Sequence, residues 1–322
     1  MKNVLILGGN GAFGRHCLHA FVSAGWQVTA LVRTMPPSSL RPSATDSQNL
    51  RYLQGDLFDT EVLNQALAEA DVVIYAINPA NYRWKNRALP WLKYFMGQLQ
   101  HHSQQRPLTV VLPDNIYTLS PENGPQFQED SPLRAQGSRS QIRLEMLEHL
   151  KACTQDPQFG KLRVIAFRMG DFIAPDTPSS WLNALLKRTQ QGYTLSLPGP
   201  ADIAHTWAYL PDATRTLEQL LQASATHVPE TGFHVFHYGG YHVDWPTLQA
   251  ALAKASQRPV KTQPFPWHWI RLGSPFSVLL QGLNEMRYLW QHEMALNDQK
   301  LKKALPQGLE QTPLEDCLRT LL

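Results

Sequence analysis

Short apolar runs alternate with helix-like segments through the first half of the chain. The apolar runs are continuous, as in strands buried on both faces of a parallel sheet, and they lie at residues 3–7, 27–32, 51–54, 71–77, 108–112 and 162–168. Helical spacing of apolar residues fills the intervals at residues 13–24, 60–70, 82–105 and 138–153, with Pro90 expected to interrupt the third helix. Strands alternating with helices predict an α/β fold with a doubly wound parallel sheet of the Rossmann type.

Beyond Asp171 this alternation stops. Helices are predicted at residues 180–191, 212–223, 244–256, 277–293 and 314–321, together with one late strand at residues 232–238. A parallel α/β domain takes roughly 150–200 residues, so a chain of 322 residues has length to spare. We therefore expect a first domain at residues 1–175, rejoined by the late strand, and a smaller C-terminal α/β lobe at residues 176–322 that mostly binds substrate.

Composition narrows the class of protein. Hydrophobic residues make up 43% of the chain, and charged residues make up 17%, which is below the usual share of about 25%. The net charge is only +3 and no run of five or more Lys and Arg occurs, which argues against nucleic acid as a partner. The cysteines Cys17, Cys153 and Cys317 lie too far apart for a CxxC pair or a disulfide framework. Because no long apolar segment or leader is evident, we expect a reduced, cytoplasmic protein without a membrane partner.

The most informative motif is a glycine turn between the first strand and the first helix. Gly8, Gly11 and Gly14 give a GxxGxxG spacing. Glycines let the backbone approach a pyrophosphate, and the start of the helix offers unpaired N–H groups and a positive dipole end. This context predicts a dinucleotide site that includes the neighbours Asn10, Ala12 and Phe13. Residues 1–175 are therefore expected to form an NAD(P)-binding domain.

The end of the second strand indicates which dinucleotide binds. An acid about 20 residues after the glycines would bind the 2′-hydroxyl of NAD, but the sequence there has Arg33 and no acid. A guanidinium suits a 2′-phosphate, so NADP(H) is favoured, with NAD(H) as the alternative. Further candidates for cofactor binding follow the third, fourth and fifth strands, and these are Asp56, Leu57, Ala76, Ile77, Asn78 and Pro113.

Several stretches together resemble the extended and atypical short-chain dehydrogenase/reductase group, which includes the NAD-dependent epimerase/dehydratases. The resemblance is clearest over residues 1–240 and rests on NVLILGGNGAFG at 3–14, LVR at 31–33, GDL at 55–57, AIN at 76–78, FRMGDFIAP at 167–175 and HTWAYLPDA at 205–213. It implies a Rossmann-type domain, a bound NAD(P)(H), and a C-terminal part that receives the substrate. It also implies that FRMGDFIAP lies near the nicotinamide and that HTWAYLPDA precedes a helix beside the substrate pocket.

The catalytic signature of that group is missing. Its members usually carry a Ser or Thr after the fifth strand and a Tyr-x-x-x-Lys on the following helix, where Lys lowers the pKa of Tyr and Tyr exchanges a proton. Here Gly137 stands where the Tyr is expected and Gln141 where the Lys is expected. Neither residue can titrate in that role. The fifth strand runs into Pro113-Asp114-Asn115-Ile116-Tyr117, without the usual serine.

Three hypotheses follow from this departure. In the first, the protein is an atypical oxidoreductase or epimerase for a small or sugar-like substrate, and Tyr117 supplies the proton because it follows a central strand; Asn115, Asp171 and His205 are weaker candidates. In the second, the protein binds NADP(H) without turnover and acts as a redox sensor or regulator. In the third, solvent or substrate supplies the proton for hydride transfer. Catalysis is favoured, and a homodimer is a possible assembly.

A group of histidines and a segment rich in Pro and Trp are two further features that bear on binding. His234, His237 and His242 lie close in sequence, but two of them are three residues apart and face opposite sides of a strand, so no metal site is predicted. The segment at residues 264–275 is dense in Pro and Trp. A pocket lid, a dimer surface and a membrane-facing patch are alternatives to ordinary packing for this segment.

Overall fold

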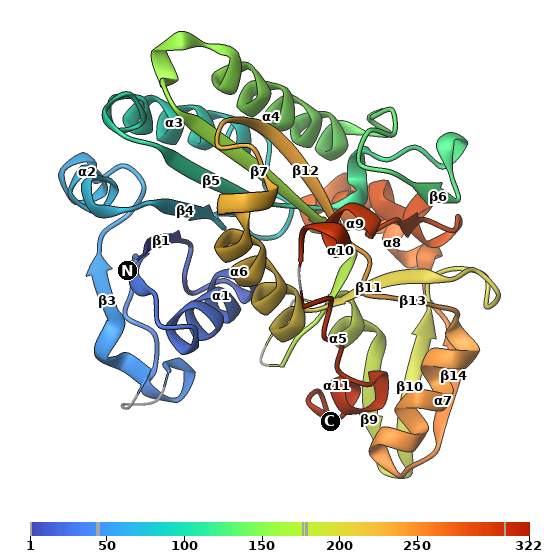
Figure 1. Ribbon diagram of the computed structural model, residues 1–322. Helices are drawn as coiled ribbons and strands as arrows, with labels where there is room; N and C mark the ends of the chain where they lie inside the picture. Colours follow the sequence, from blue (N-terminus) through green and yellow to red (C-terminus); the bar gives the residue numbers. More distant parts are fainter. Residues whose placement is uncertain (1, 43–45, 176, 178–179, 306) are drawn as a thin grey trace.

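A seven-stranded sheet forms the centre of the molecule in the computed structural model, which describes residues 2–42, 46–175, 177, 180–305 and 307–322 (Figure 1). All its strand pairs are parallel, in the order β12-β7-β5-β4-β1-β2-β3. The strands are β1 (Asn3–Leu7), β2 (Gln27–Val32), β3 (Leu50–Gln54), β4 (Val72–Tyr75), β5 (Leu108–Asp114), β7 (Leu162–Met169) and β12 (Gly232–Tyr238). The predicted Rossmann-type α/β fold class is confirmed.

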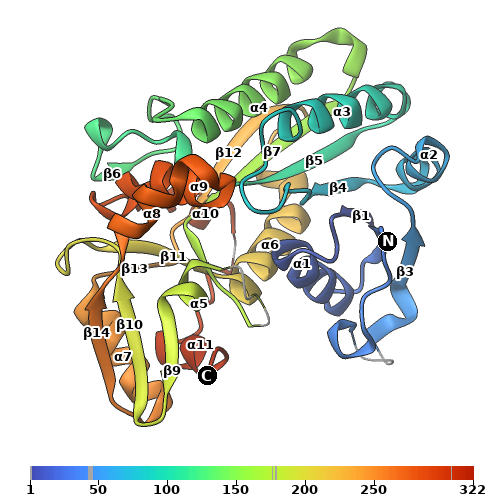
Figure 2. The same ribbon diagram turned by 180° about the vertical axis from the view of Figure 1, so that it is seen from behind.

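Helices cover both faces of this sheet (Figures 1 and 2). One face packs against α1 (Ala12–Ser23), α6 (Leu210–His227) and α10 (Gln299–Ala304) in a single apolar cluster. The other face packs against α2 (Thr60–Glu69), α3 (Ala88–Gln105) and α4 (Ser138–Gln155). Strands buried on both sides explain why their sequences are continuously apolar.

The residues that follow β7 build a second, smaller group of elements. One three-stranded sheet has the order β14-β10-β9 and another the order β13-β11-β8. Their strands are β8 (Asp171–Ile173), β9 (Leu186–Thr189), β10 (Gly192–Leu197), β11 (His205–Tyr209), β13 (Tyr241–Val243) and β14 (Val260–Pro264). The helices are α5 (Trp181–Leu185), α7 (Trp245–Ser256), α8 (Trp267–Gly273), α9 (Val278–Glu285) and α11 (Leu314–Arg319).

Short elements complete the chain. The 3-10 turns that matter for the site are η3 (Ile116–Thr118), η6 (Ser274–Phe276) and η7 (Met286–Trp290). The remaining 3-10 turns are η1 (Ser38–Leu40), η2 (Asp46–Asn49), η4 (Pro121–Asn123) and η5 (Pro157–Phe159). A two-stranded pair joins β6 (Gln126–Phe127) to β15 (Ala295–Leu296).

Some predicted elements are wrong in extent or type. The helix predicted at 180–191 stops at Leu185, because the chain then forms β9 and pairs antiparallel with β10. The third helix begins only at Ala88, so Pro90 lies in its first turn, where proline is tolerated, and interrupts nothing. The helix predicted at 277–293 ends at Glu285 and continues as a 3-10 turn. The division into domains at residue 175 stays a prediction.

Candidate cofactor and substrate site

The glycine turn joins the end of β1 to the start of α1, and each glycine has a steric reason. Gly8 has a φ of +84°, and a Cβ on it would lie 2.7 Å from the Ala76 carbonyl oxygen. A Cβ on Gly14 would overlap the carbonyl oxygen of Gly8, so helix and turn can pack this closely only without a side chain. Gly11 is the N-cap and makes no side-chain cap hydrogen bond. The first N–H groups of α1 are therefore not capped by a side chain, as an anion site requires.

The neighbours of these glycines split into exposed and buried positions. Asn10 is exposed, and its amide donates to the Thr34 carbonyl over 2.7 Å, which ties the turn to the end of β2. Ala12 is half-buried. Phe13 is buried in the core beneath the turn. Asn10 and Ala12 therefore lie on the surface of the turn, whereas Phe13 supports it from below.

A shallow pocket beside the turn brings Arg33 and Asp56 together, between the ends of β2 and β3. Gln54, Gly55, Phe58 and Asp59 complete its lining. Arg33 is exposed directly after β2, where the sequence predicts contact with the 2′-phosphate of NADP(H). The Asp56 carboxylate already accepts the backbone N–H of Phe58 over 2.7 Å and that of Asp59 over 3.2 Å. Asp56 therefore shapes the loop as well as lining the pocket.

The other predicted cofactor residues differ in exposure. Leu57 is buried and supports the loop, so it presents no side chain at the surface. Ala76 and Ile77 follow β4 and are half-buried, and Asn78 is exposed. Ala76 abuts Gly8, which places this strand end against the glycine turn. Pro113 is half-buried, one residue before the end of β5.

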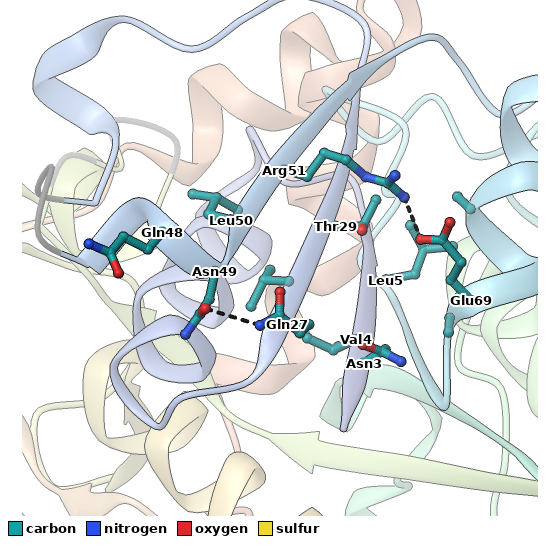
Figure 3. A pocket seen from close by; sticks show the side chains of 13 residues that line it. Asn3, Val4, Leu5, Gln27, Thr29, Gln48, Asn49, Leu50, Arg51 and Glu69 are labelled. Atoms are coloured by element: carbon teal, nitrogen blue, oxygen red, sulfur yellow. Dashed lines mark hydrogen bonds and ion pairs between the residues drawn. The ribbon is translucent and has the colours of Figure 1, made fainter. Parts of the chain in front are cut away.

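A second pocket lies at the opposite edge of the sheet. It is lined from the amino ends of β1, β2 and β3, including Asn3, Gln27 and Leu50 (Figure 3). Ligands of doubly wound sheets bind outside the carboxyl ends of the strands. We therefore assign this pocket no part in cofactor binding.

Tyr117 lies in η3, directly beyond the carboxyl end of β5. Its ring stacks on Trp84 with centroids 5.9 Å apart, and its hydroxyl lies 3.5 Å from that of Tyr82. Tyr288 donates from its hydroxyl to the Tyr117 carbonyl over 2.8 Å. Burial, together with nearby Tyr82 and Asp171, raises the pKa of Tyr117 well above its usual value. The phenol is therefore protonated at neutral pH, as a proton donor must be.

The weaker candidates have partners of their own. Asn115 accepts the Tyr117 backbone N–H over 3.1 Å and so caps η3. His205 and Asp171 form a pair with Nε2 and Oδ2 2.8 Å apart, from the adjacent strands β11 and β8. The His205 ring stacks on Trp290 with centroids 4.0 Å apart. Asp171 keeps 15% of its side chain exposed and Asn115 is half-buried, whereas His205 is buried.

A buried charge network occupies the ends of β5, β7 and β12. Arg168 donates from Nε to Asp114 over 2.7 Å, and its Nη1 lies 3.3 Å from His237 Nε2. Burial and Arg168 lower the pKa of His237 to about 3, so this imidazole is neutral and its Nε2 can accept a hydrogen bond from Arg168 Nη1. Asp114 at the end of β5 is thus committed to an arginine.

The start of α4 holds the largest departure from a Tyr-x-x-x-Lys site. Glu285 of α9 accepts the Arg139 backbone N–H over 2.6 Å and its Nη1 over 2.5 Å. A Cβ on Gly137 would overlap the same carboxylate. The space beside Gly137 is thus filled by Glu285, and a side chain at position 137 would have to displace this carboxylate from Arg139.

The face of α4 that packs against the sheet presents arginines. Gln141 is exposed and bonds Glu145, so it does not face the site. Arg139 and Arg143 are both buried and four residues apart, the spacing of Tyr and Lys in the usual signature. The Arg143 guanidinium lies 5.0 Å from the Trp84 ring, on which Tyr117 also stacks. Sequence reasoning missed this pair, although its spacing was visible.

Histidines do not gather into a metal site. Among the described residues, no group of three or more His, Cys, Asp or Glu is placed to hold a metal ion. His242 instead lies 3.0 Å from Glu293 and 2.9 Å from Thr206. In the same described part of the chain, no helix combines the length and the apolar character needed to cross a bilayer.

Comparison with known proteins finds sequence similarity in the first part of the chain. Residues 1–87 match the model of the NmrA-like family. An isoflavone reductase homolog of Zea mays is 32% identical over 96 residues, which cover 29% of this chain and 31% of that protein. The isoflavone reductase of Glycine max is 36% identical over 88 residues, covering 23% and 28%. These matches span less than one third of either relative.

Solved structures match over nearly the whole chain. The dTDP-glucose 4,6-dehydratase DesIV of Streptomyces venezuelae, solved with NAD, has a TM-score of 0.73 at 16% identity, covering 99% of this chain and 96% of its own. A UDP-galactose 4-epimerase has a TM-score of 0.70 at 15% identity, covering 99% and 97%. The fold is that of the NAD-dependent epimerases and dehydratases. The resemblance to the extended short-chain dehydrogenase/reductase group is thus confirmed at the level of the fold.

Within this epimerase/dehydratase fold, the glycine turn and the start of α4 differ in how far they match the expected site. The glycine turn keeps the steric features of a dinucleotide site. The start of α4, where the sequence resemblance implied a Tyr-x-x-x-Lys pair, holds an arginine–glutamate pair.

Proposed function

We propose that the protein binds NAD(P)(H) at the glycine turn, with a preference for NADP(H). The observation that carries this proposal is the packing of Gly8 and Gly14, which excludes a Cβ at both positions and leaves the N-terminus of α1 open. The exposed Arg33 beside the turn supports the preference, because a guanidinium can bind a 2′-phosphate through paired, charged hydrogen bonds.

Titration with NADPH and NADH, followed by fluorescence, tests the preference. We expect NADPH to bind more tightly, and Arg33→Ala to weaken NADPH by roughly tenfold while leaving NADH nearly unchanged, because one charge-assisted contact is lost. Arg83→Ala, which removes an exposed cation outside this pocket, is the matched control. Equal affinities for the two nucleotides in the unaltered protein would remove the role of Arg33.

We further propose an oxidoreductase or epimerase activity on a small or sugar-like substrate, with Tyr117 as the proton donor. A bound nicotinamide would supply or accept hydride. The protonated Tyr117 hydroxyl would deliver a proton to a substrate oxygen, and Tyr82 beside it would hold the phenol in place. Asp171, held by His205, would line the substrate side.

A substrate screen that follows cofactor absorbance tests this activity. Tyr117→Phe keeps the stacking on Trp84 but removes the proton, so we expect kcat to fall by roughly 10²-fold or more. Tyr94→Phe, which removes the hydroxyl of a half-buried tyrosine bonded to Thr60, is the matched control. Turnover that is unaffected by Tyr117→Phe would assign proton transfer to solvent or substrate.

The alternative is a non-catalytic NADP(H)-binding sensor or regulator. The observation that favours it is the Arg139–Glu285 pair, which fills the place of the usual catalytic side chain and is committed to structure. This alternative predicts tight NADPH binding, no turnover in any substrate class, and a cofactor-dependent protein partner in a pull-down. Turnover with any substrate class would reject it.

A further inference from the structure

The exposed large apolar side chains gather on the hairpin made by α8, η6 and α9. Of those in the described part of the chain, five lie within residues 269–279, and we call these five the apolar tip: Trp269, Leu272, Phe276, Val278 and Leu279. Phe276 is 92% exposed and Leu272 is 69% exposed. Contiguous apolar exposure of this kind marks a contact surface.

The inner side of the same hairpin is firmly attached. Gly282 packs against the Tyr82 ring so closely that a Cβ there would overlap it. Glu285 bonds the start of α4, and Arg139 donates from Nη2 to the Val278 carbonyl over 3.1 Å. The apolar tip is therefore the outward face of an anchored element.

The stretches of chain that form the small sheet and the outer part of the hairpin are poor in acids, and Glu285 at the end of α9 is bonded to Arg139. Residues 177–200 and 245–284 contain no Asp or Glu, although the chain has 26. Lys254 is offset by Glu315 at 3.0 Å. The other Lys and Arg of these two stretches are exposed, and we call them the basic strip: Lys187, Arg188, Arg258, Lys261 and Arg271.

Three residues of the basic strip lie on the small sheet whose strand β14 leads into the hairpin. Lys187 of β9 and Lys261 of β14 both pair in register with Thr194 of β10, so the two lysines lie on the same face of the small sheet. From β14 the chain passes almost directly into α8, and both views show the hairpin at that end of the small sheet (Figures 1 and 2). Arg271 brings a positive charge into the apolar tip itself.

We propose that the apolar tip and basic strip dock onto an anionic membrane surface. Protruding aromatic and aliphatic side chains enter the headgroup boundary, and nearby Lys and Arg are attracted to acidic lipids. A second copy fits less well, because a two-fold interface would bring two basic strips together. This contact requires no helix of the described chain to cross the bilayer. The proposal therefore replaces the expectation of no membrane partner with contact at the membrane surface alone.

Flotation of the full chain with lipid vesicles, without nucleotide, tests the proposal. We expect flotation with vesicles of phosphatidylcholine and phosphatidylglycerol, weaker flotation with phosphatidylcholine alone, and a decrease as salt rises. Trp269→Ser with Phe276→Ser should weaken binding roughly tenfold or more, because two large apolar side chains no longer enter the lipid. Lys187→Gln with Lys261→Gln should remove the preference for phosphatidylglycerol.

Phe58→Ser, at an exposed apolar residue away from the hairpin, and Lys151→Gln, at an exposed lysine of α4, are the matched controls. Unchanged circular dichroism shows that the variants are folded. No flotation of the folded, unaltered protein overturns the proposal. So does a dimer in light scattering that Trp269→Ser with Phe276→Ser dissociates, because a second copy then covers the tip. These results are independent of cofactor binding, which is measured without lipid.

Discussion

The N-termini of α1 and α4 have the same kind of N-cap residue but different surroundings. Both helices start at a glycine N-cap with no side-chain cap from that residue, Gly11 and Gly137 respectively. At α1 the packing of Gly8 and Gly14 excludes a Cβ, and the N-cap Gly11 makes no side-chain hydrogen bond to the first N–H groups. At α4 the room is taken by Glu285, which bonds the Arg139 backbone and guanidinium. An open helix start suits a ligand, whereas one occupied by the protein's own carboxylate is structural.

The largest effect is expected at the open helix start. Gly14→Val would place side-chain atoms where the Gly8 carbonyl lies, so the turn must open. We expect NADPH binding to weaken roughly 100-fold or more, because the pyrophosphate depends on this backbone geometry. Titration by fluorescence measures the loss.

Gly97→Ala is the control for this change. Gly97 lies within α3, and a Cβ there meets nothing within 4 Å. The substitution should leave NADPH affinity unchanged and raise the free energy of unfolding by about 1 kcal/mol or less. If Gly14→Val bound NADPH as tightly as Gly97→Ala, the open turn would have no role in binding.

The filled helix start predicts an effect on stability. Glu285→Ala removes one partner of a pair whose side chains are only 5% and 14% exposed, so Arg139 is left buried and unpaired. We expect the free energy of unfolding to fall by about 3–5 kcal/mol. Urea unfolding followed by circular dichroism measures it.

Asp316→Ala is the matched control, because its partner Arg319 lies at 2.5 Å in an exposed pair. Its cost should stay below about 1 kcal/mol. Equal costs for the two substitutions would show that the carboxylate at α4 contributes no more than a surface charge.

A smaller effect is expected on the stability of the fold at acidic pH. Burial lowers the pKa of His16, on α1, to about 4, and that of His237, beside Asp114, to about 3, against 6.5 for a free imidazole. Well above pH 6.5 these histidines are neutral in both the folded and the unfolded chain, so they do not lower the free energy of unfolding. As the pH falls below 6.5, the unfolded chain binds protons that the folded chain does not, so stability declines down to about pH 4 and further toward 3.

Melting temperatures between pH 7.5 and 4.5, roughly the window of that decline, check this expectation. His16→Gln should flatten the slope, because glutamine does not titrate. A slope that His16→Gln does not alter would mean that the pKa of His16 is the same in the folded and unfolded chains.

The contrast between the two helix starts also explains what the sequence could predict. The strand, glycine turn and helix at residues 3–23 are adjacent in the chain, so spacing alone was enough to predict them. The partner of Arg139 lies 146 residues away, and no local pattern points to Glu285. Likewise β9 was predicted as helix because its strand character comes from pairing with β10 rather than from its own residues.

The candidate site divides in the same way. Gly8, Gly14 and Arg33 could be inferred from a local motif, and the structure gives the glycines steric reasons. Tyr117 was inferred from its place after β5, but its neighbours Trp84, Tyr82 and Arg143 come from other segments. Side chains that converge from separate segments have no signature in one sequence.

The most direct test of the account is a calorimetric titration of the unaltered protein with NADPH and then with NADH. The account predicts saturable binding of NADPH at one site per chain, weaker binding of NADH, and no heat from either nucleotide with Gly14→Val. An unaltered, folded protein that binds neither nucleotide would contradict it, because the open helix start at Gly11 would then hold no cofactor.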